Sequence, residues 1–247
     1  MSNNHLDNSL EIAITSAKLA GKFLNDQYSR ELDVVFDEGR DIKLQIDRDA
    51  EEIISNYLSN NSDLPIMGEE FGASSELGKD YWIVDPLDGT SNFFRNIPIC
   101  AVSIAMIKNN IPVIGVIYDF LNKKIYSASK DGGAFCNNEL IQTSKITDKK
   151  KGTLVTGIPA RESYSEEDFR NIISHFQDWK KVRMIGSAAI ANILVATGSA
   201  EVYKEDGIFF WDIAAGSVIV QEAGGLASIT NIQDDYRVDA EFTNGNF

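Results

Sequence analysis

The spacing of hydrophobic positions changes along this chain, and it predicts alternating helices and strands. Residues 10–28 carry apolar side chains every third or fourth position, which is typical of an amphipathic helix. Residues 101–108 and 109–120 are instead almost continuously apolar, as expected of buried strands. The same criteria predict further helices at 47–60, 166–176, 187–198 and 209–225, and further strands at 64–67, 81–85, 124–130, 152–158, 181–186, 200–206 and 226–230.

Three of these strands follow one another directly and predict an antiparallel meander over 101–130. Asn109-Asn110 and Leu121-Asn122 supply the turns between them. A meander is incompatible with a purely parallel sheet, so the chain is expected to be a layered α+β enzyme with two lobes. The polar, charged segment 147–152 predicts the boundary, with one lobe at 1–147 and the other at 148–247.

Composition and charge exclude several kinds of partner. The chain has 247 residues, of which 43% are hydrophobic and 24% charged, as in an ordinary globular protein. Its formal net charge of −14 repels nucleic acid and anionic membranes, so we expect neither as a partner. No apolar run approaches the roughly 18 residues that a membrane-spanning helix needs.

Cysteine and histidine content bears on compartment and chemistry. Cys100 and Cys136 have no metal-binding or redox spacing, and the N-terminal segment lacks the features of a signal peptide, so we expect a cytoplasmic protein. The two histidines, His5 and His175, lie in polar surroundings, and histidine-based catalysis is not expected.

The segment WIVDPLDGTSNF (82–93) places Asp85 and Asp88 directly after a predicted strand. Asp-Pro and Asp-Gly pairs are common in turns, which explains each aspartate on its own. The end of a strand is also where open sheets bind ligands. Gly89 allows close approach of backbone N–H groups to an anion, and Thr90 and Ser91 add hydroxyl donors. Two neighbouring carboxylates need a counter-charge, and a divalent cation is the simplest one.

Further acidic residues occur in comparable places. Glu69 and Glu70 follow the strand at 64–67, Asp212 lies in the first turn of a predicted helix, and Asp47 begins another. The helix dipole explains Asp212, and helix capping explains Asp47. Their combination with the 82–93 segment favours a site for a hard cation such as Mg²⁺, which prefers oxygen ligands.

Two separated segments resemble the signatures of the inositol monophosphatase family. Residues 82–93 are similar to the first signature and residues 211–225 to the second, in the same order. PIMGEE (65–70) is similar to the glutamate segment of the family, and residues 186–203 also follow its pattern. The resemblance extends over about residues 10–246. It implies a Mg²⁺-dependent phosphomonoesterase with a layered αβαβα fold of the sugar-phosphatase type.

The resemblance also implies a role for each matching residue. One Mg²⁺ would be bound by Glu69, Asp85, Asp88 and the backbone carbonyl of Leu87, and a second by Asp85, Asp88 and Asp212, with a weaker third ion held through water by Glu69. Asp47 and Thr90 would orient the attacking water. Glu70 would help to orient that water or a metal-bound one without itself binding the metal. The phosphate group of the substrate would contact Gly89, Thr90 and Ser91. The alcohol part of the substrate would lie along Gly186, Ser187 and Ala188, and the hydroxyls of that alcohol would contact Glu205. A homodimer and sensitivity to lithium are further implications.

One segment departs from the family pattern. Phe36 stands where members usually have a lysine, and Lys43-Leu44 replace Val-Thr, although Asp41 is retained. Arg40 or Lys43 could replace the lysine at the site, but a solvated charged loop explains this segment equally well.

Several substrates are consistent with the resemblance. Inositol monophosphate is the simplest, and the alternatives within the family are 3′(2′),5′-bisphosphate nucleotides, fructose 1,6-bisphosphate and histidinol phosphate. A bisphosphate needs additional basic residues, and near the second signature Lys204 is the nearest, which favours a monophosphate. A non-catalytic binding protein on the same scaffold is the alternative of another class, and the retained acids argue against it. A haloacid-dehalogenase-type phosphatase needs Asp-x-Asp near the start of the chain, which is absent.

Overall fold

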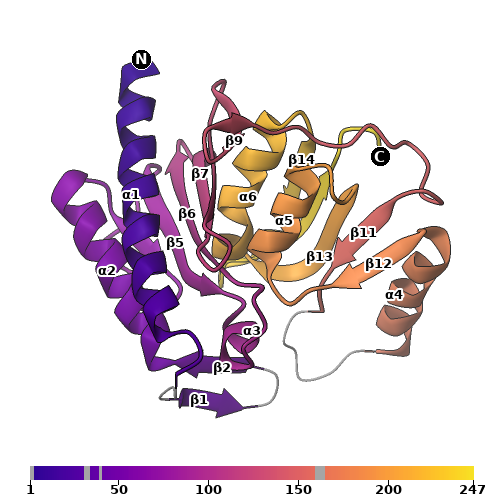
Figure 1. The fold of residues 1–247 in the computed structure, drawn as a ribbon, viewed down its shortest axis with the longest axis horizontal. Coiled ribbons are helices and arrows are strands. Elements are labelled where there is room, and N and C mark those ends of the chain that lie inside the picture. The colour runs from indigo at the N-terminus through magenta and orange to yellow at the C-terminus, as the bar shows by residue number, and fades with distance from the viewer. Residues whose placement is uncertain (1–2, 31–33, 39–40, 159–164) are drawn as a thin grey trace.

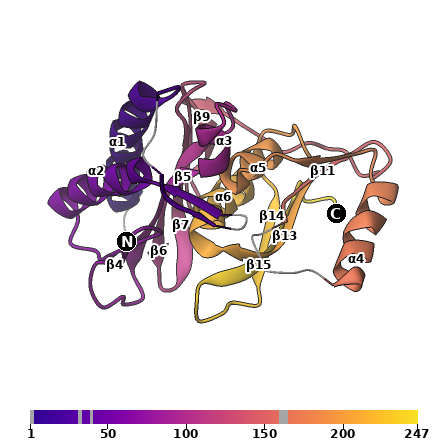
Figure 2. The same ribbon diagram turned by 90° about the horizontal axis from the view of Figure 1, so that it is seen from below.

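The helices and strands of this protein form five layers, as expected from the sequence. The computed structural model describes residues 3–30, 34–38, 41–158 and 165–247. Helices α1 (Asn3–Gln27) and α2 (Gln45–Asn61) form the first layer, an eight-stranded sheet the second, α5 (Ala188–Ala196) and α6 (Phe210–Glu222) the third and a five-stranded sheet the fourth. Helix α4 (Glu166–Asp178) lies beyond the second sheet (Figures 1 and 2). The predicted αβαβα class is therefore confirmed.

The first sheet has the order β10-β9-β8-β7-β6-β5-β3-β4, with only β3 and β5 parallel among neighbouring strands. Its strands are β3 (Ile66–Gly68), β4 (Gly72–Ala73), β5 (Tyr81–Asp88), β6 (Ala101–Lys108), β7 (Ile111–Asp119), β8 (Lys124–Ser129), β9 (Gly133–Cys136) and β10 (Glu139–Leu140). The meander predicted over 101–130 is confirmed as β6–β8. Both of its predicted turns are present, the first with Asn109 and Asn110 at positive φ.

Both faces of the first sheet are buried, which explains its continuously apolar strands. Along β6, Val102, Ile104 and Met106 pack toward α1 and α2, whereas Ala105 and Ile107 pack toward α5 and α6. This alternation follows from the two-residue period of a strand. Helices α5 and α6 are in turn covered on both sides by the sheets, and their sequences are apolar on nearly all faces.

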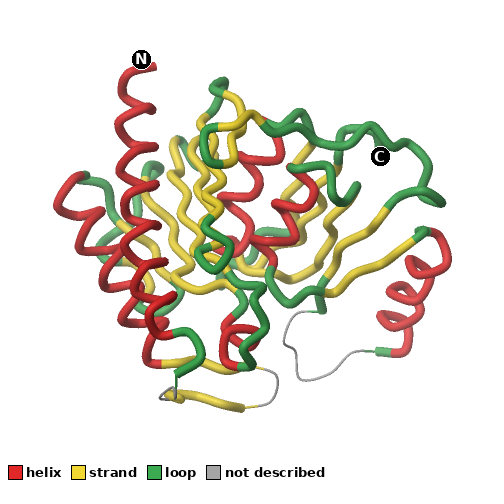
Figure 3. The backbone as a smooth tube through the Cα atoms, viewed as in Figure 1, coloured by secondary structure: helices red, strands yellow, loops and turns green. Residues whose placement is uncertain are grey.

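The second sheet has the order β12-β11-β13-β15-β14. Figure 3 shows its yellow strands between the red helices of the middle layer and the outer helix α4. Its strands are β11 (Thr153–Thr156), β12 (Lys181–Met184), β13 (Val202–Phe209), β14 (Leu226–Thr230) and β15 (Arg237–Thr243). The lobe boundary predicted near residue 147 falls between the strands of the two sheets. The division into two lobes stays a prediction, because α5 and α6 share one hydrophobic core with both sheets.

Several elements differ from those predicted. The helix predicted from residue 10 begins at Asn3, and the helix predicted from Asp47 begins at Gln45. Strands β9, β10 and β15 and the short helix α3 (Thr90–Phe94) were not predicted. In β15 the burial of Val238, Ala240 and Phe242 follows the two-residue period of a strand, and residues 237–242 alternate between polar and apolar in the same way.

The segment before α2 is a hairpin of β1 (Val34–Glu38) and β2 (Asp41–Leu44). A simple solvated loop was therefore the wrong expectation for its backbone. Arg40 lies outside the described residues, and so do the side chains of Phe36, Asp41, Lys43 and Leu44, so their predicted roles lie outside the described part of the chain.

Strand β5 continues past the expected end at Asp85. Asp85 pairs with Ser103 and Asp88 with Ala101, so three steps along β5 correspond to two along β6. Pro86 lies inside this bulge, where its missing N–H costs no ladder hydrogen bond. The bulge carries both aspartates of the motif to the end of the first sheet.

Among the described residues, no helix is both long enough and apolar enough to span a lipid bilayer.

Replacement of Gly115 tests the packing of α6 on the first sheet. A Cβ at Gly115 in β7 would overlap the backbone carbonyl of Ala215 in α6. We expect Gly115→Ala to lower the free energy of unfolding by about 1–3 kcal/mol, measured by urea denaturation. Gly78→Ala is the matched control, because nothing lies within 4 Å of its added Cβ. Equal stability of the two variants would contradict this packing.

Candidate metal centre

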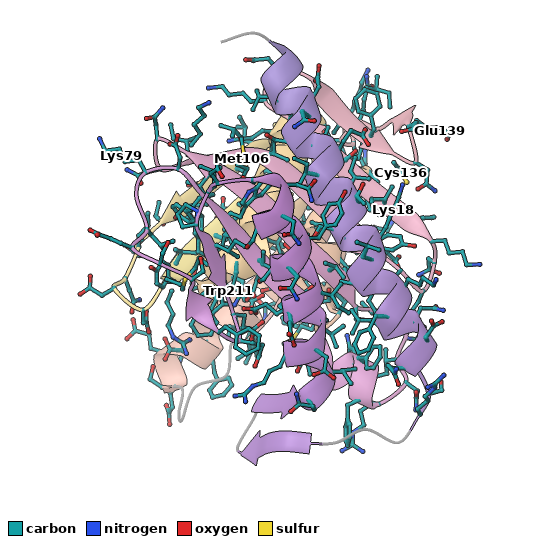
Figure 4. All side chains as sticks on the ribbon, turned by 90° about the vertical axis from the view of Figure 1, so that its left-hand side faces the viewer. Lys18, Lys79, Met106, Cys136, Glu139 and Trp211 are labelled. Atoms are coloured by element: carbon teal, nitrogen blue, oxygen red, sulfur yellow. The ribbon has the colours of Figure 1, made fainter. Side chains whose placement is uncertain are left out.

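Three acidic side chains from distant parts of the chain meet at one place. Glu69 follows β3, Asp85 lies on β5, and Asp212 belongs to the first turn of α6. One carboxylate oxygen from each lies within 4.8 Å of the others, and Asp85 is 1% exposed. Figure 4 shows Trp211, the residue before Asp212, below Met106 of β6 and toward the end of the molecule where β1 and β2 lie. We call Glu69, Asp85 and Asp212 the acidic cluster.

Local structure explains how each residue reaches the cluster. Strands β3 and β5 are parallel neighbours, and the Glu69 N–H donates to the Val84 carbonyl at 3.2 Å, so Glu69 and Asp85 leave the same end of the sheet. Phe209 is the N-cap of α6, and its N–H donates to the Asp212 carboxylate three residues later. This half of a capping box, together with the helix dipole, favours an acid at position 212.

Burial and mutual repulsion oppose ionisation of the cluster. The pKa of Asp85 is raised well above its usual value by burial, and then by the charges of Glu69, Asp88 and Asp212. Burial and the charges of Glu69, Asp88 and Glu205 raise the pKa of Asp212 in the same way. Carboxylates held together in this manner are suited to a hard divalent cation, which removes the repulsion and prefers oxygen ligands.

Asp88 is held differently from the cluster residues. Its carboxylate accepts hydrogen bonds from the Ser187 hydroxyl, from the Ala188 N–H at 3.1 Å and from the Ala189 N–H at 2.9 Å. Burial raises its pKa to about 6, and these bonds oppose the rise. Asp88 therefore connects β5 with the N-terminus of α5, and its charge raises the pKa values of Asp85 and Asp212. Its role as a metal ligand stays a prediction.

The residues after Asp85 form a tight connection into α3. The Leu87 N–H donates to Asp85 at 2.9 Å, and the Thr90 hydroxyl donates to the Leu87 carbonyl at 3.0 Å. Gly89 has a φ of 88°, and a Cβ there would approach the Ile99 carbonyl to 2.8 Å, so this turn requires glycine. Ser91 follows in α3. The predicted contacts of residues 87 and 89–91 with metal and phosphate stay predictions.

Asp47 lies on α2, and Glu70 belongs to the turn after β3 that α2 contacts. Asp47 is 2% exposed, and because α2 begins two residues before it, it belongs to the first turn instead of capping the helix. The Glu70 side chain is 3% exposed and lies 3.7 Å from Arg48 of α2. Their predicted roles toward water stay predictions.

The second sheet contributes Glu205 on β13. Glu205 is 8% exposed and accepts a hydrogen bond from the Tyr203 hydroxyl at 3.0 Å. Burial raises its pKa to about 7, the bond from Tyr203 opposes this rise, and the charges of Asp88 and Asp206 add to it. Its charge also raises the pKa of Asp212.

Asn92 is a residue of the site that the sequence did not single out. Its side-chain amide donates to the carbonyls of Ile99 at 2.8 Å, Ile185 at 2.7 Å and Gly186 at 3.2 Å. It therefore fastens α3 to the segment that leads into Ser187. The residue lies inside the 82–93 motif, but a single asparagine in a polar stretch gives no sign of bonds to residues 93 and 94 positions away.

Taken with the fold, these residues define a class of protein: a two-sheet α+β sandwich with a partly buried acidic cluster where the first sheet meets α6. Comparison with known proteins specifies the class. The model of the inositol monophosphatase family matches residues 5–243, and this chain belongs to that family.

The relatives carry more than one name. The chain is 34% identical over 228 residues to human inositol monophosphatase 1, covering 88% of this chain and 82% of that protein. It is also 34% identical to the Nus factor SuhB of Xylella fastidiosa, covering 93% and 85% of the two chains. Among solved structures, the inositol monophosphatase of Anabaena matches with a TM-score of 0.83 and 28% identity over 98% of this chain and 92% of that one.

The raised pKa values predict how pH changes the stability of the metal-free protein. The folded protein binds these protons more tightly than the unfolded chain, whose carboxyl pKa values are about 4. The stabilisation is therefore complete below pH 4 and is lost as the pH rises toward about 6 for Asp88, about 7 for Glu205 and higher for Asp85 and Asp212.

In a chelator, we expect the melting temperature to fall from pH 5 to pH 8, and to fall less in Asp212→Asn, which lacks one buried charge. Asp178→Asn, at an exposed position of α4, is the control and should follow the wild type. An identical pH dependence of Asp212→Asn and wild type would contradict the repulsion.

Proposed function

We propose that this protein hydrolyses a small polyol or sugar phosphate monoester, most simply inositol monophosphate, with Mg²⁺ as cofactor. The observation that carries the proposal is the approach of Glu69, Asp85 and Asp212 to within 4.8 Å. Membership of the inositol monophosphatase family supports a metal-dependent phosphatase. The finer choice of substrate rests on the scarcity of basic residues in the sequence around the second signature, residues 211–225.

The residues present fit two or three Mg²⁺ ions. All the predicted donors are oxygen atoms: the cluster carboxylates, the Asp88 carboxylate and the Leu87 carbonyl. Bound Mg²⁺ would supply positive charge that lowers the pKa of a water and stabilises the phosphoryl oxygens. Asp88 would keep its hydrogen bonds from the start of α5, which use both carboxylate oxygens, and would bind Mg²⁺ through a remaining lone pair.

The protein side chains would position water and substrate around this charge. Asp47 and Thr90 would orient the attacking water, and Glu70, held by Arg48, would steer it from behind. The backbone of Gly89 and the hydroxyls of Thr90 and Ser91 would bind phosphate oxygens. Gly186, Ser187 and Ala188 would contact the alcohol, and the Glu205 carboxylate, fixed by Tyr203, would accept hydrogen bonds from its hydroxyls.

Other properties carry over as expectations. A homodimer is expected from the family resemblance, and a cytoplasmic location from the cysteine content. Some relatives of similar identity are named inositol monophosphatase 1 and others Nus factor SuhB, so a non-catalytic binding function is the alternative that experiment must exclude. The net charge of −14 argues against direct nucleic-acid binding by this chain.

Phosphate release tests the proposed function. With a panel of phosphomonoesters we expect release that requires Mg²⁺ and stops in a chelator. Asp85→Asn and Asp212→Asn should each lower turnover at least about 100-fold, beyond the roughly 10- to 100-fold typical of residues behind metal ligands. Asp178→Asn should retain wild-type turnover. No release from any ester by the wild type would favour the binding-protein alternative.

The role of Glu205 can be separated from that of the metal centre. We expect Glu205→Gln to raise KM for inositol monophosphate while kcat changes little, because the lost contact is made with the bound alcohol. With p-nitrophenyl phosphate, which has no neighbouring hydroxyls, the same variant should match the wild type. An equal change of kcat/KM for both esters would show that Glu205 does not bind the hydroxyl groups of the alcohol.

A further inference from the structure

The turn that carries Glu69 and Glu70 is held by a buried side chain of α2. Glu51 accepts the N–H of Glu70 at 2.8 Å with Oε2 and the N–H of Phe71 at 3.1 Å with Oε1. It is 1% exposed. The strand pairing of β3 with β5 ends at Gly68, and the Glu69 N–H makes the last hydrogen bond to β5. Glu51 therefore supplies acceptors where the sheet supplies none.

A second observation shows that the chain is built to admit this carboxylate. A Cβ at Gly68 would overlap the Glu51 side chain, so a glycine at the end of β3 leaves the space that Glu51 occupies. Glu51 lies one helical turn after Asp47, on the same buried face of α2. Arg48, from the same turn as Asp47, pairs with Glu70. Helix α2 thus contacts the 69–71 turn through two side chains.

The turn needs such support because Glu69 is repelled by the other two carboxylates of the acidic cluster. The charge of Glu69 raises the pKa values of both Asp85 and Asp212, so repulsion pushes Glu69 away from the other two. A backbone anchored at residues 70 and 71 limits this movement.

We propose that Glu51 is a positioning residue, which fixes the backbone of residues 69–71 and thereby holds Glu69 against Asp85 and Asp212 for cation binding. The inference rests on the proposed function as far as the cation is Mg²⁺. It assigns Glu51 no contact with metal or substrate, and its effect is expected in metal affinity.

The test is Mg²⁺ binding to the metal-free full chain, measured by isothermal titration calorimetry. In Glu51→Gln, one of the two acceptors becomes an amide group that faces a backbone N–H. Gly68→Ala displaces the carboxylate without changing it, and serves if the first variant does not fold. We expect about 10- to 100-fold weaker Mg²⁺ binding in each, as is typical when a partner behind a ligand is removed.

Two controls separate positioning from general stability. Glu52→Gln changes the adjacent, exposed glutamate of α2 and should alter neither Mg²⁺ affinity nor melting temperature. Ile54→Val trims a fully buried residue of the same helix, and should lower the melting temperature while leaving Mg²⁺ affinity unchanged.

The outcomes distinguish this inference from the proposed function. If Glu51→Gln or Gly68→Ala folds and binds Mg²⁺ as tightly as the wild type, the positioning role is overturned, even if the melting temperature falls. Weaker binding in the variants with no phosphate release by the wild type would support positioning and refute the phosphatase. A wild type that binds no Mg²⁺ would overturn both.

Discussion

Repulsion among three clustered carboxylates is the interaction around which this structure is organised. Glu69, Asp85 and Asp212 approach within 4.8 Å, although burial and like charge raise the pKa values of Asp85 and Asp212. Strand pairing holds the first two, and the packing of α6 between the sheets holds the third. The favourable energy of that packing therefore keeps together charges that would otherwise separate, and a bound cation would convert the repulsion into attraction.

The same region joins the two halves of the chain. Asp88, from the first sheet, accepts hydrogen bonds at the N-terminus of α5, and Asn92 bonds to the carbonyls of Ile185 and Gly186. Asp212 reaches the cluster from α6. The proposed metal ligands and the proposed alcohol contacts are thus mechanically connected, and the geometry of one depends on the packing of the other.

Local sequence patterns predicted most of the fold and part of the site. The helix at 10–28 and the meander at 101–130 follow from long apolar patterns, whereas β15 and the strands of the β1–β2 hairpin lie among many charged residues and were missed. The acids of the cluster stand out because each follows a strand or begins a helix. Their convergence depends on contacts across more than 100 residues, and the family resemblance, not periodicity, supplied it. Glu51 and Asn92 were missed because a side chain that bonds a distant backbone has no local signature.

The most direct test is a crystal structure of the full chain soaked in Mn²⁺, a substitute for Mg²⁺ whose anomalous scattering identifies the ion. The account predicts an anomalous peak bound by carboxylate oxygens of Glu69, Asp85 and Asp212. A structure in which these three side chains point away from one another, with Mn²⁺ bound elsewhere or not at all, would contradict it.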